Sequence, residues 1–90
     1  MIKAFSARIT GKVQGVFFRQ SSKEKALSLG LTGFVQNEAD GSVFLIAEGV
    51  DEPLQSLKDW CRHGPPLSRV ESIEIVDVDP SGIKGFQIKR

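Results

Sequence analysis

The sequence has little of the chemistry that metal and redox sites need. It contains one cysteine, Cys61, and one histidine, His63, in 90 residues. A single cysteine excludes a disulfide within the chain and fits a reducing compartment, so we expect a cytoplasmic protein. One cysteine and one histidine do not make a zinc site, and no EF-hand, Walker A or GxGxxG spacing occurs. We therefore expect no metal and no cofactor.

The chain also lacks a strong charge of one sign and a long apolar run. Twelve basic residues against eleven acidic ones leave a formal net charge of +1, which gives no general attraction to nucleic acid or anionic membranes. The longest apolar run, Val43 to Ala47, is far shorter than the ~20 residues that cross a bilayer. Met1 to Ala4 lack the apolar stretch of a secretory signal. We expect no nucleic-acid partner and no membrane.

What is present describes an ordinary globular chain. Hydrophobic residues make up 40% of the sequence and charged residues 26%, which excludes a disordered chain. A length of 90 residues predicts a single domain over 1–90. Because no large apolar surface stripe is evident, we expect a monomer.

Hydrophobic periodicity predicts the order β-α-β-β-α-β with a short extra strand at the end. The expected strands cover residues 3–13, 32–37, 42–48, 70–78 and a short segment with Phe86 and Ile88. The expected helices cover residues 18–29 and about 52–63. This order is that of an α+β ferredoxin-like sandwich, an antiparallel sheet with two helices on one face.

Local signals set the expected boundaries of these elements. Gly30 stands where a glycine closes a helix, and Asp51 is the expected N-cap of the second helix. The apolar parity of the fourth strand switches between Ile75 and Val76, which predicts a bulge or twist there. The expected apolar stripe of the second helix is Val50, Leu54, Leu57 and Cys61.

The first candidate site is the segment GKVQGVFFR at 11–19. A glycine-bracketed turn that leads into a helix N-terminus aims main-chain N–H groups at one point, and such a concavity binds anions. Arg19 in the first turn opposes the helix dipole, which makes sense if an anion lies between the guanidinium and the amides. The planar guanidinium of arginine can donate hydrogen bonds to two phosphate oxygens at once, whereas the ammonium group of lysine acts as a point charge. A surface arginine beside a tight turn is the alternative.

Asn37, at the end of the second strand, is the second candidate. Asparagine is depleted in strands, although it also starts turns such as the Asn-Glu-Ala-Asp-Gly connection that follows. In the predicted topology the first and second strands both lie antiparallel to the third, so their C-terminal ends share one edge of the sheet. Asn37 and Arg19 could therefore face one pocket.

These residues carry a family resemblance. GKVQGVFFR at 11–19 and GFVQNEADGSVFLIAEG at 33–49 resemble the two signature segments of the acylphosphatases. The Gly64-Pro65-Pro66 break and the closing Gly85 to Ile88 are also similar to that family, so the resemblance covers nearly the whole chain. It implies hydrolysis of acyl phosphates to a carboxylate and inorganic phosphate. It also implies that Arg19 binds phosphate and that Asn37 holds the attacking water.

The residue types fit such a reaction without a metal. A carboxylate leaving group, with a conjugate-acid pKa of roughly 4, departs without a general acid. What remains is to hold the phosphoryl group and to place a water in line. The expected catalytic residues are Arg19 and Asn37. The expected substrate-binding residues are Gln14, Gly15, Val16, Phe17, Phe18 and Arg19, mainly through their main-chain amides.

Other residues have structural interpretations. The side chain of Gln14 could brace the loop. Phe17 and Phe18 could shape a pocket for the acyl group, but core packing of Phe18 and a partly exposed Phe17 ring are the favoured interpretation. Cys61 and His63 are expected to be structural, and Ser21 to Lys25 are interpreted as a solvated helix face.

Two other function classes share this topology. Ferredoxin-like sheets often bind RNA by stacking bases on aromatic residues of the central strands. Here Phe5 and Phe44 are the aromatic residues of those strands, and the basic-aromatic RNP1 pattern is missing. A small-molecule regulatory domain would share the fold but not the site. Neither alternative needs the glycine loop with Arg19 and Asn37.

Overall fold

The computed structural model describes residues 1–89, and it has the predicted element order. The strands are Lys3–Lys12 (β1), Thr32–Asn37 (β2), Val43–Gly49 (β3), Arg69–Val78 (β4) and Phe86–Lys89 (β5). The helices are Phe18–Ser28 (α1) and Asp51–Cys61 (α2). The five strands form one sheet in the order β4-β1-β3-β2-β5. Every neighbouring pair is antiparallel except β2 and β5, which are parallel. The ferredoxin-like α+β fold is confirmed.

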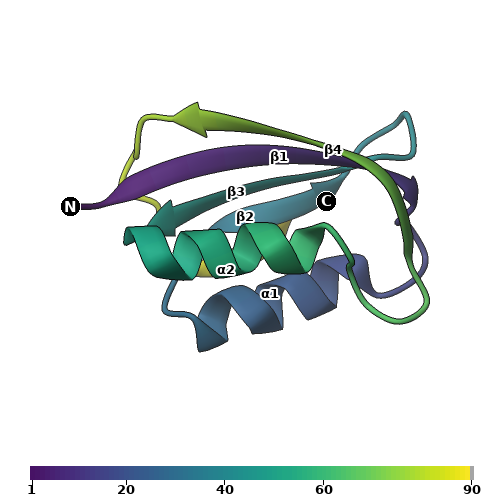
Figure 1. Cartoon of the computed structure of the whole chain (residues 1–90), viewed down its shortest axis with the longest axis horizontal. Coiled ribbons are helices and arrows are strands. Elements are labelled where there is room, and N and C mark those ends of the chain that lie inside the picture. The colour runs from purple at the N-terminus through teal and green to yellow at the C-terminus, as the bar shows by residue number, and fades with distance from the viewer. Residues whose placement is uncertain (90) are drawn as a thin grey trace.

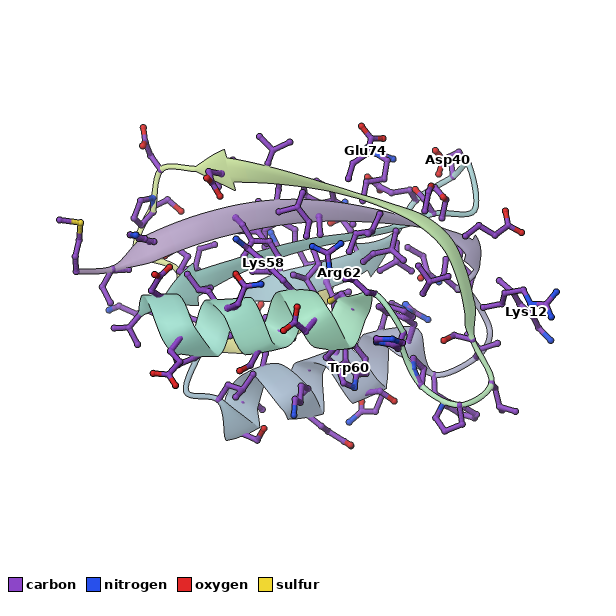
Figure 2. The ribbon with its side chains drawn as sticks, in the orientation of Figure 1. Lys12, Asp40, Lys58, Trp60, Arg62 and Glu74 are labelled. Atoms are coloured by element: carbon purple, nitrogen blue, oxygen red, sulfur yellow. The ribbon has the colours of Figure 1, made fainter. Side chains whose placement is uncertain are left out.

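Both helices cover the same face of the sheet, and the core lies between the two layers (Figure 1). Alternate residues of β3, such as Leu45, point into this core and are fully buried, as the period of a strand requires. From α1 the helical spacing brings Phe18, Ser22 and Ala26 to the sheet. Trp60 of α2 packs edge-on against the Phe18 ring, with 5.4 Å between centroids, and Figure 2 shows it between the two helices.

The structure corrects the predicted start of α2. The N-cap is Val50, in an extended conformation, and Asp51 is the first helical residue with no capping hydrogen bond from its side chain. Asp51 still stabilises α2, because a carboxylate in the first turn interacts favourably with the helix dipole. Val50 is 48% exposed, so the buried stripe of α2 consists of Leu54, Leu57 and Cys61 only.

The predicted irregularity between Ile75 and Val76 is also wrong. These residues pair in regular register with Ala7 and Ser6 of β1. The parity switches because β4 is an edge strand, whose Val76 is exposed to solvent. The register shift lies instead between Thr10 and Gly11 of β1.

The residues interpreted as one solvated face of α1 are not all exposed. Ser22 is fully buried, and its hydroxyl donates to the carbonyl oxygen of Arg19 at 3.0 Å. That hydrogen bond lets a polar residue lie against the core.

The helix-free face of the sheet carries a pair of phenylalanine rings, Phe34 and Phe44, with centroids 6.2 Å apart. The Lys89 ammonium lies 4.0 Å from the centroid of Phe34, and the Arg8 guanidinium lies 5.9 Å from that of Phe44. Phe5, by contrast, is buried in the core and is therefore unable to stack on a base. Within residues 1–89, no helix is long and apolar enough to cross a membrane.

Candidate active site

The elements that carry the candidate residues meet at one end of the molecule. Since β1 and β2 are both antiparallel to β3, their C-terminal ends lie at the same edge of the sheet. Figure 1 shows the end of β1, the start of α1 and the β2–β3 turn together at this end. In Figure 2, Lys12 projects from the end of β1, and Asp40 lies in the β2–β3 turn, well separated from Lys12 but at the same end of the molecule.

The segment between β1 and α1 presents main-chain donors to this edge. Gly15 has φ +73° and Phe17 has φ +66°, and left-handed residues within a turn curve successive N–H groups towards a common point. None of the N–H groups from Gly15 to Gln20 donates to an acceptor within residues 1–89. Phe17 is the N-cap of α1 and makes no side-chain cap, and the first turn contains no acidic residue. The helix N-terminus thus keeps the unpaired donors and positive potential that favour an anion.

Arg19 lies in this first turn and is half-buried. No carboxylate of residues 1–89 lies within ion-pair distance of its guanidinium. A guanidinium next to free amides at a helix N-terminus is locally unfavourable until an anion binds between them.

Asn37 ends β2 and pairs with Val43 across the hairpin. Its Oδ1 is the one buried side-chain oxygen or nitrogen in the described chain that has no hydrogen-bond partner. A buried carbonyl left unpaired costs about 1–3 kcal/mol of stability. Such an orphaned group needs an explanation beyond packing.

A pocket of about 590 Å³ joins these features. Its lining consists of Val13, Gly15, Phe17, Phe18, Arg19, Gln20, Asn37 and Ile88. The structure therefore brings Arg19 and Asn37 to one pocket, together with Gly15, Phe17 and Phe18 of the loop. The chemical roles of these residues remain predictions.

The remaining two predicted substrate-binding residues do not line the pocket. Val16 is buried in the core. Gln14 uses both hydrogens of its side-chain amide as a brace, since Nε2 donates to the carbonyl oxygens of Glu38 at 2.8 Å and Ser42 at 2.9 Å. Only the main-chain amides of Gln14 and Val16 are available for the predicted role.

The β2–β3 turn is itself tightly bonded. Asp40 accepts from the Ser42 amide at 2.9 Å and from the Ser42 hydroxyl at 2.6 Å. Arg8 of β1 donates to the Ser42 hydroxyl oxygen at 3.0 Å and pairs with Asp40 at 3.4 Å. The Ser42 hydroxyl, the Ser42 amide and then the Arg8 charge hold the pKa of Asp40 below its ordinary value. Asp40 is thus an exposed carboxylate that also bonds the turn together.

Sequence reasoning missed the pocket-lining residues Val13, Gln20 and Ile88, and the buried Ser42. Ile88 reaches the pocket because β5 lies next to β2 and parallel to it. No local sequence pattern predicts that pairing. The sequence places Ser42 at the start of the third expected strand, and only its bonds to Arg8 and Asp40 explain its burial.

Cys61 and His63 lie away from the pocket, as expected. Burial outweighs the opposing charge of Arg62 and raises the pKa of the Cys61 thiol to about 12, so this sulfur is not a nucleophile at neutral pH. His63 is exposed and contacts the carbonyl oxygen of Asp59 at the end of α2. Within residues 1–89, no cluster of histidine, cysteine and carboxylate side chains is arranged to hold a metal ion.

Comparison with known proteins gives a consistent picture. The family model described as Acylphosphatase matches residues 5–88. A curated relative, the acylphosphatase of Nostoc sp., is 43% identical over 82 residues, which cover 91% of this chain and 81% of the relative. The acylphosphatase of Salinibacter ruber is 45% identical over 89 residues, covering 98% of this chain and 94% of the relative.

A solved structure, the acylphosphatase from Bacillus subtilis, superposes with a TM-score of 0.95 at 33% sequence identity, and each chain covers 100% of the other.

Proposed function

The chain belongs to the acylphosphatase family, a family of hydrolases, and from this premise we propose that it cleaves the carboxyl-phosphate bond of acyl phosphates. The products are a carboxylate and inorganic phosphate. The observation that carries the proposal is the shared pocket, in which Arg19 and Asn37 lie beside a helix N-terminus with unpaired amides.

In this proposal Arg19 and the loop amides hold the phosphoryl group. Phosphoryl transfer depends mainly on positioning and on stabilising the charge of the equatorial oxygens. The guanidinium fork binds two of these oxygens, and the amides from about Gln14 to Phe18 donate to the others. Because these donors are fixed by the fold before substrate binds, little reorganisation is needed during the reaction.

Asn37 orients the attacking water. Its Oδ1, which has no partner within the described chain, has to accept a hydrogen bond from that water. A half-turn of the carboxamide about the Cβ–Cγ bond exchanges the oxygen and nitrogen with almost no change of shape. We propose that this half-turn directs the oxygen to the pocket that Asn37 lines.

The proposed reaction needs no general acid. The leaving carboxylate has a conjugate-acid pKa of roughly 4, so it departs as the anion near neutral pH. None of the described residues that line the pocket is a histidine or carries a carboxylate. This agrees with a mechanism that relies on binding and orientation alone.

The proposal also covers the oligomeric state, the cellular location and the partners of the enzyme. We propose a monomeric, single-domain, cytoplasmic enzyme that acts on a small molecule and binds neither nucleic acid nor membrane. The near-zero net charge supports the last point, and the single buried cysteine fits a reducing compartment.

The test is hydrolysis of benzoyl phosphate by the full chain, with and without excess EDTA. We expect turnover that EDTA leaves intact, and much slower turnover of an alkyl phosphomonoester, whose alkoxide leaving group needs an acid. Absence of benzoyl phosphate hydrolysis would refute the proposed activity. Loss of turnover in EDTA with recovery on adding Mg²⁺ would refute the metal-independent mechanism.

A further inference from the structure

Phe17 combines two unfavourable features that anion binding does not explain. The residue is 71% exposed, and its backbone lies in the left-handed region with φ +66° and ψ +21°. A bulky residue seldom adopts this conformation. The loop needs the conformation to direct its amides, but glycine or asparagine would supply it with less strain. We therefore expect the phenyl ring to have a function that is separate from the role of the Phe17 amide.

Phe17 lines the proposed active pocket. Phe17 and Ile88 provide accessible apolar surface, whereas Val13 and Phe18 are buried, and Arg19, Gln20 and Asn37 provide polar groups. A volume of about 590 Å³ lies within the ~300–1,000 Å³ typical of sites for small organic ligands. A phosphate group alone leaves much of this space unfilled.

The charge of the lining residues limits which chemical groups can fill the rest of the pocket. Arg19 is the one charged side chain among the lining residues of the described chain, and the bound phosphoryl group occupies it. A second anionic group on the substrate would meet no further cation in this lining. An apolar acyl group would instead cover the exposed Phe17 ring, with an aromatic one adding an edge or offset contact between rings.

We propose that the Phe17 ring binds the acyl group of the substrate, so that the enzyme prefers acyl phosphates whose acyl group is uncharged and apolar or aromatic. The inference rests on the proposed function, because a phosphoryl group held at Arg19 fixes the place of the acyl group. Phe17 thus has two parts in the site. Its amide belongs to the anion-binding loop, and its ring sets the specificity.

The experiment compares kcat/KM for benzoyl phosphate with kcat/KM for acetyl phosphate. Phe17→Asn keeps a residue that tolerates the left-handed backbone but removes the ring. We expect the benzoyl-to-acetyl ratio to fall about five- to tenfold, the value of a lost aromatic contact, mainly through KM for benzoyl phosphate. Phe17→Leu keeps apolar bulk and is expected to retain more than half of the preference.

Leu67→Asn is the matched control, since Leu67 is 63% exposed and does not line the pocket. The control should leave the ratio unchanged. An unchanged ratio in Phe17→Asn, or an equal fall in Leu67→Asn, overturns the role of the ring. Failure of the native chain to hydrolyse either substrate overturns the proposed function itself, so the two failures are distinguishable.

Discussion

The guanidinium of Arg19 shows how one residue makes an anion site out of a common turn. The free amides of the loop attract many anions weakly, whereas a planar fork selects a group with paired oxygens. No carboxylate of the described chain neutralises this fork, so its charge is available to the substrate.

Arg19→Lys keeps the charge and removes the fork. We expect kcat/KM for benzoyl phosphate to fall by about 10²-fold or more, as when a fixed transition-state donor is lost, and inhibition by inorganic phosphate to weaken. Steady-state kinetics with phosphate as inhibitor measure both effects. Lys25→Arg, which exchanges a cation in the last turn of α1, is the control and should behave as the native chain. Near-native turnover by Arg19→Lys would exclude a bidentate role.

Asn37→Ala separates binding from catalysis. Because the carboxamide is proposed to act on the water and not on phosphate, kcat should fall about 10²-fold while the inhibition constant of phosphate changes little. The variant should also be no less stable, since it removes a buried oxygen that has no partner. Intact turnover with weakened phosphate inhibition would contradict the assignment.

At the scale of elements, the anion-binding loop and the β2–β3 turn behave as one unit because Gln14 joins them. The side chain donates to two carbonyl oxygens of the turn, and that turn begins directly after Asn37. The distance between the amides and the carboxamide is therefore held by a side chain that does not line the pocket.

Gln14→Leu keeps the size of the side chain and removes both hydrogen bonds. We expect a loss of about 1–3 kcal/mol in the free energy of unfolding, because two hydrogen bonds of about 0.5–1.5 kcal/mol each are removed. Both carbonyl oxygens keep a main-chain donor, the amide of Gly41 for Glu38 and the amide of Glu38 for Ser42. We also expect a fall in kcat larger than the change in KM, because the water and the phosphoryl group lose their alignment. Denaturant unfolding and steady-state kinetics measure the two effects. Gln55→Leu, at an exposed position on α2, is the control, and an effect on stability alone would show that Gln14 has no positioning role.

At the scale of the whole molecule, Glu48 ties the last part of the chain to the middle of the sheet. Its buried carboxylate accepts hydrogen bonds from the amides of Ser81, Gly82 and Ile83 and from the Ser81 hydroxyl. It thereby fixes the connection that carries the chain from the β4 edge to the β5 edge. Burial by itself would raise the pKa of Glu48, but these hydrogen bonds outweigh it and hold the pKa below its ordinary value.

A lowered pKa means that Glu48 contributes stability above the pKa of the unfolded chain, roughly 4.3, and that this contribution is lost as the pH falls through the folded pKa. Glu48→Gln should therefore lower the free energy of unfolding by about 1.5–3 kcal/mol at pH 7, and the difference from the native chain should shrink as the pH falls below about 4.3. Urea unfolding at several pH values measures it. Glu74→Gln, at an exposed position of β4, should show neither effect, and a constant difference at all pH values would argue against the charged form of Glu48.

The sequence by itself determined the order of the elements and most of their bounds, because strand and helix periodicities are local and the glycines mark the turns. It also determined the resemblance of the two signature segments, which the family match confirms. Its errors at Asp51 and Val76 have one cause. Whether a residue caps a helix or faces the core depends on what packs around it, and β4 is an edge strand.

Only the tertiary structure decided which residues share the pocket and how they are held. Arg19, Asn37 and Ile88 come from α1, β2 and β5, and they meet because the strand order brings those elements to one edge. The brace from Gln14 and the anchoring of the last connection by Glu48 are hydrogen bonds between residues far apart in the chain. Such bonds form only when folding has brought their partners together, so no local pattern encodes them.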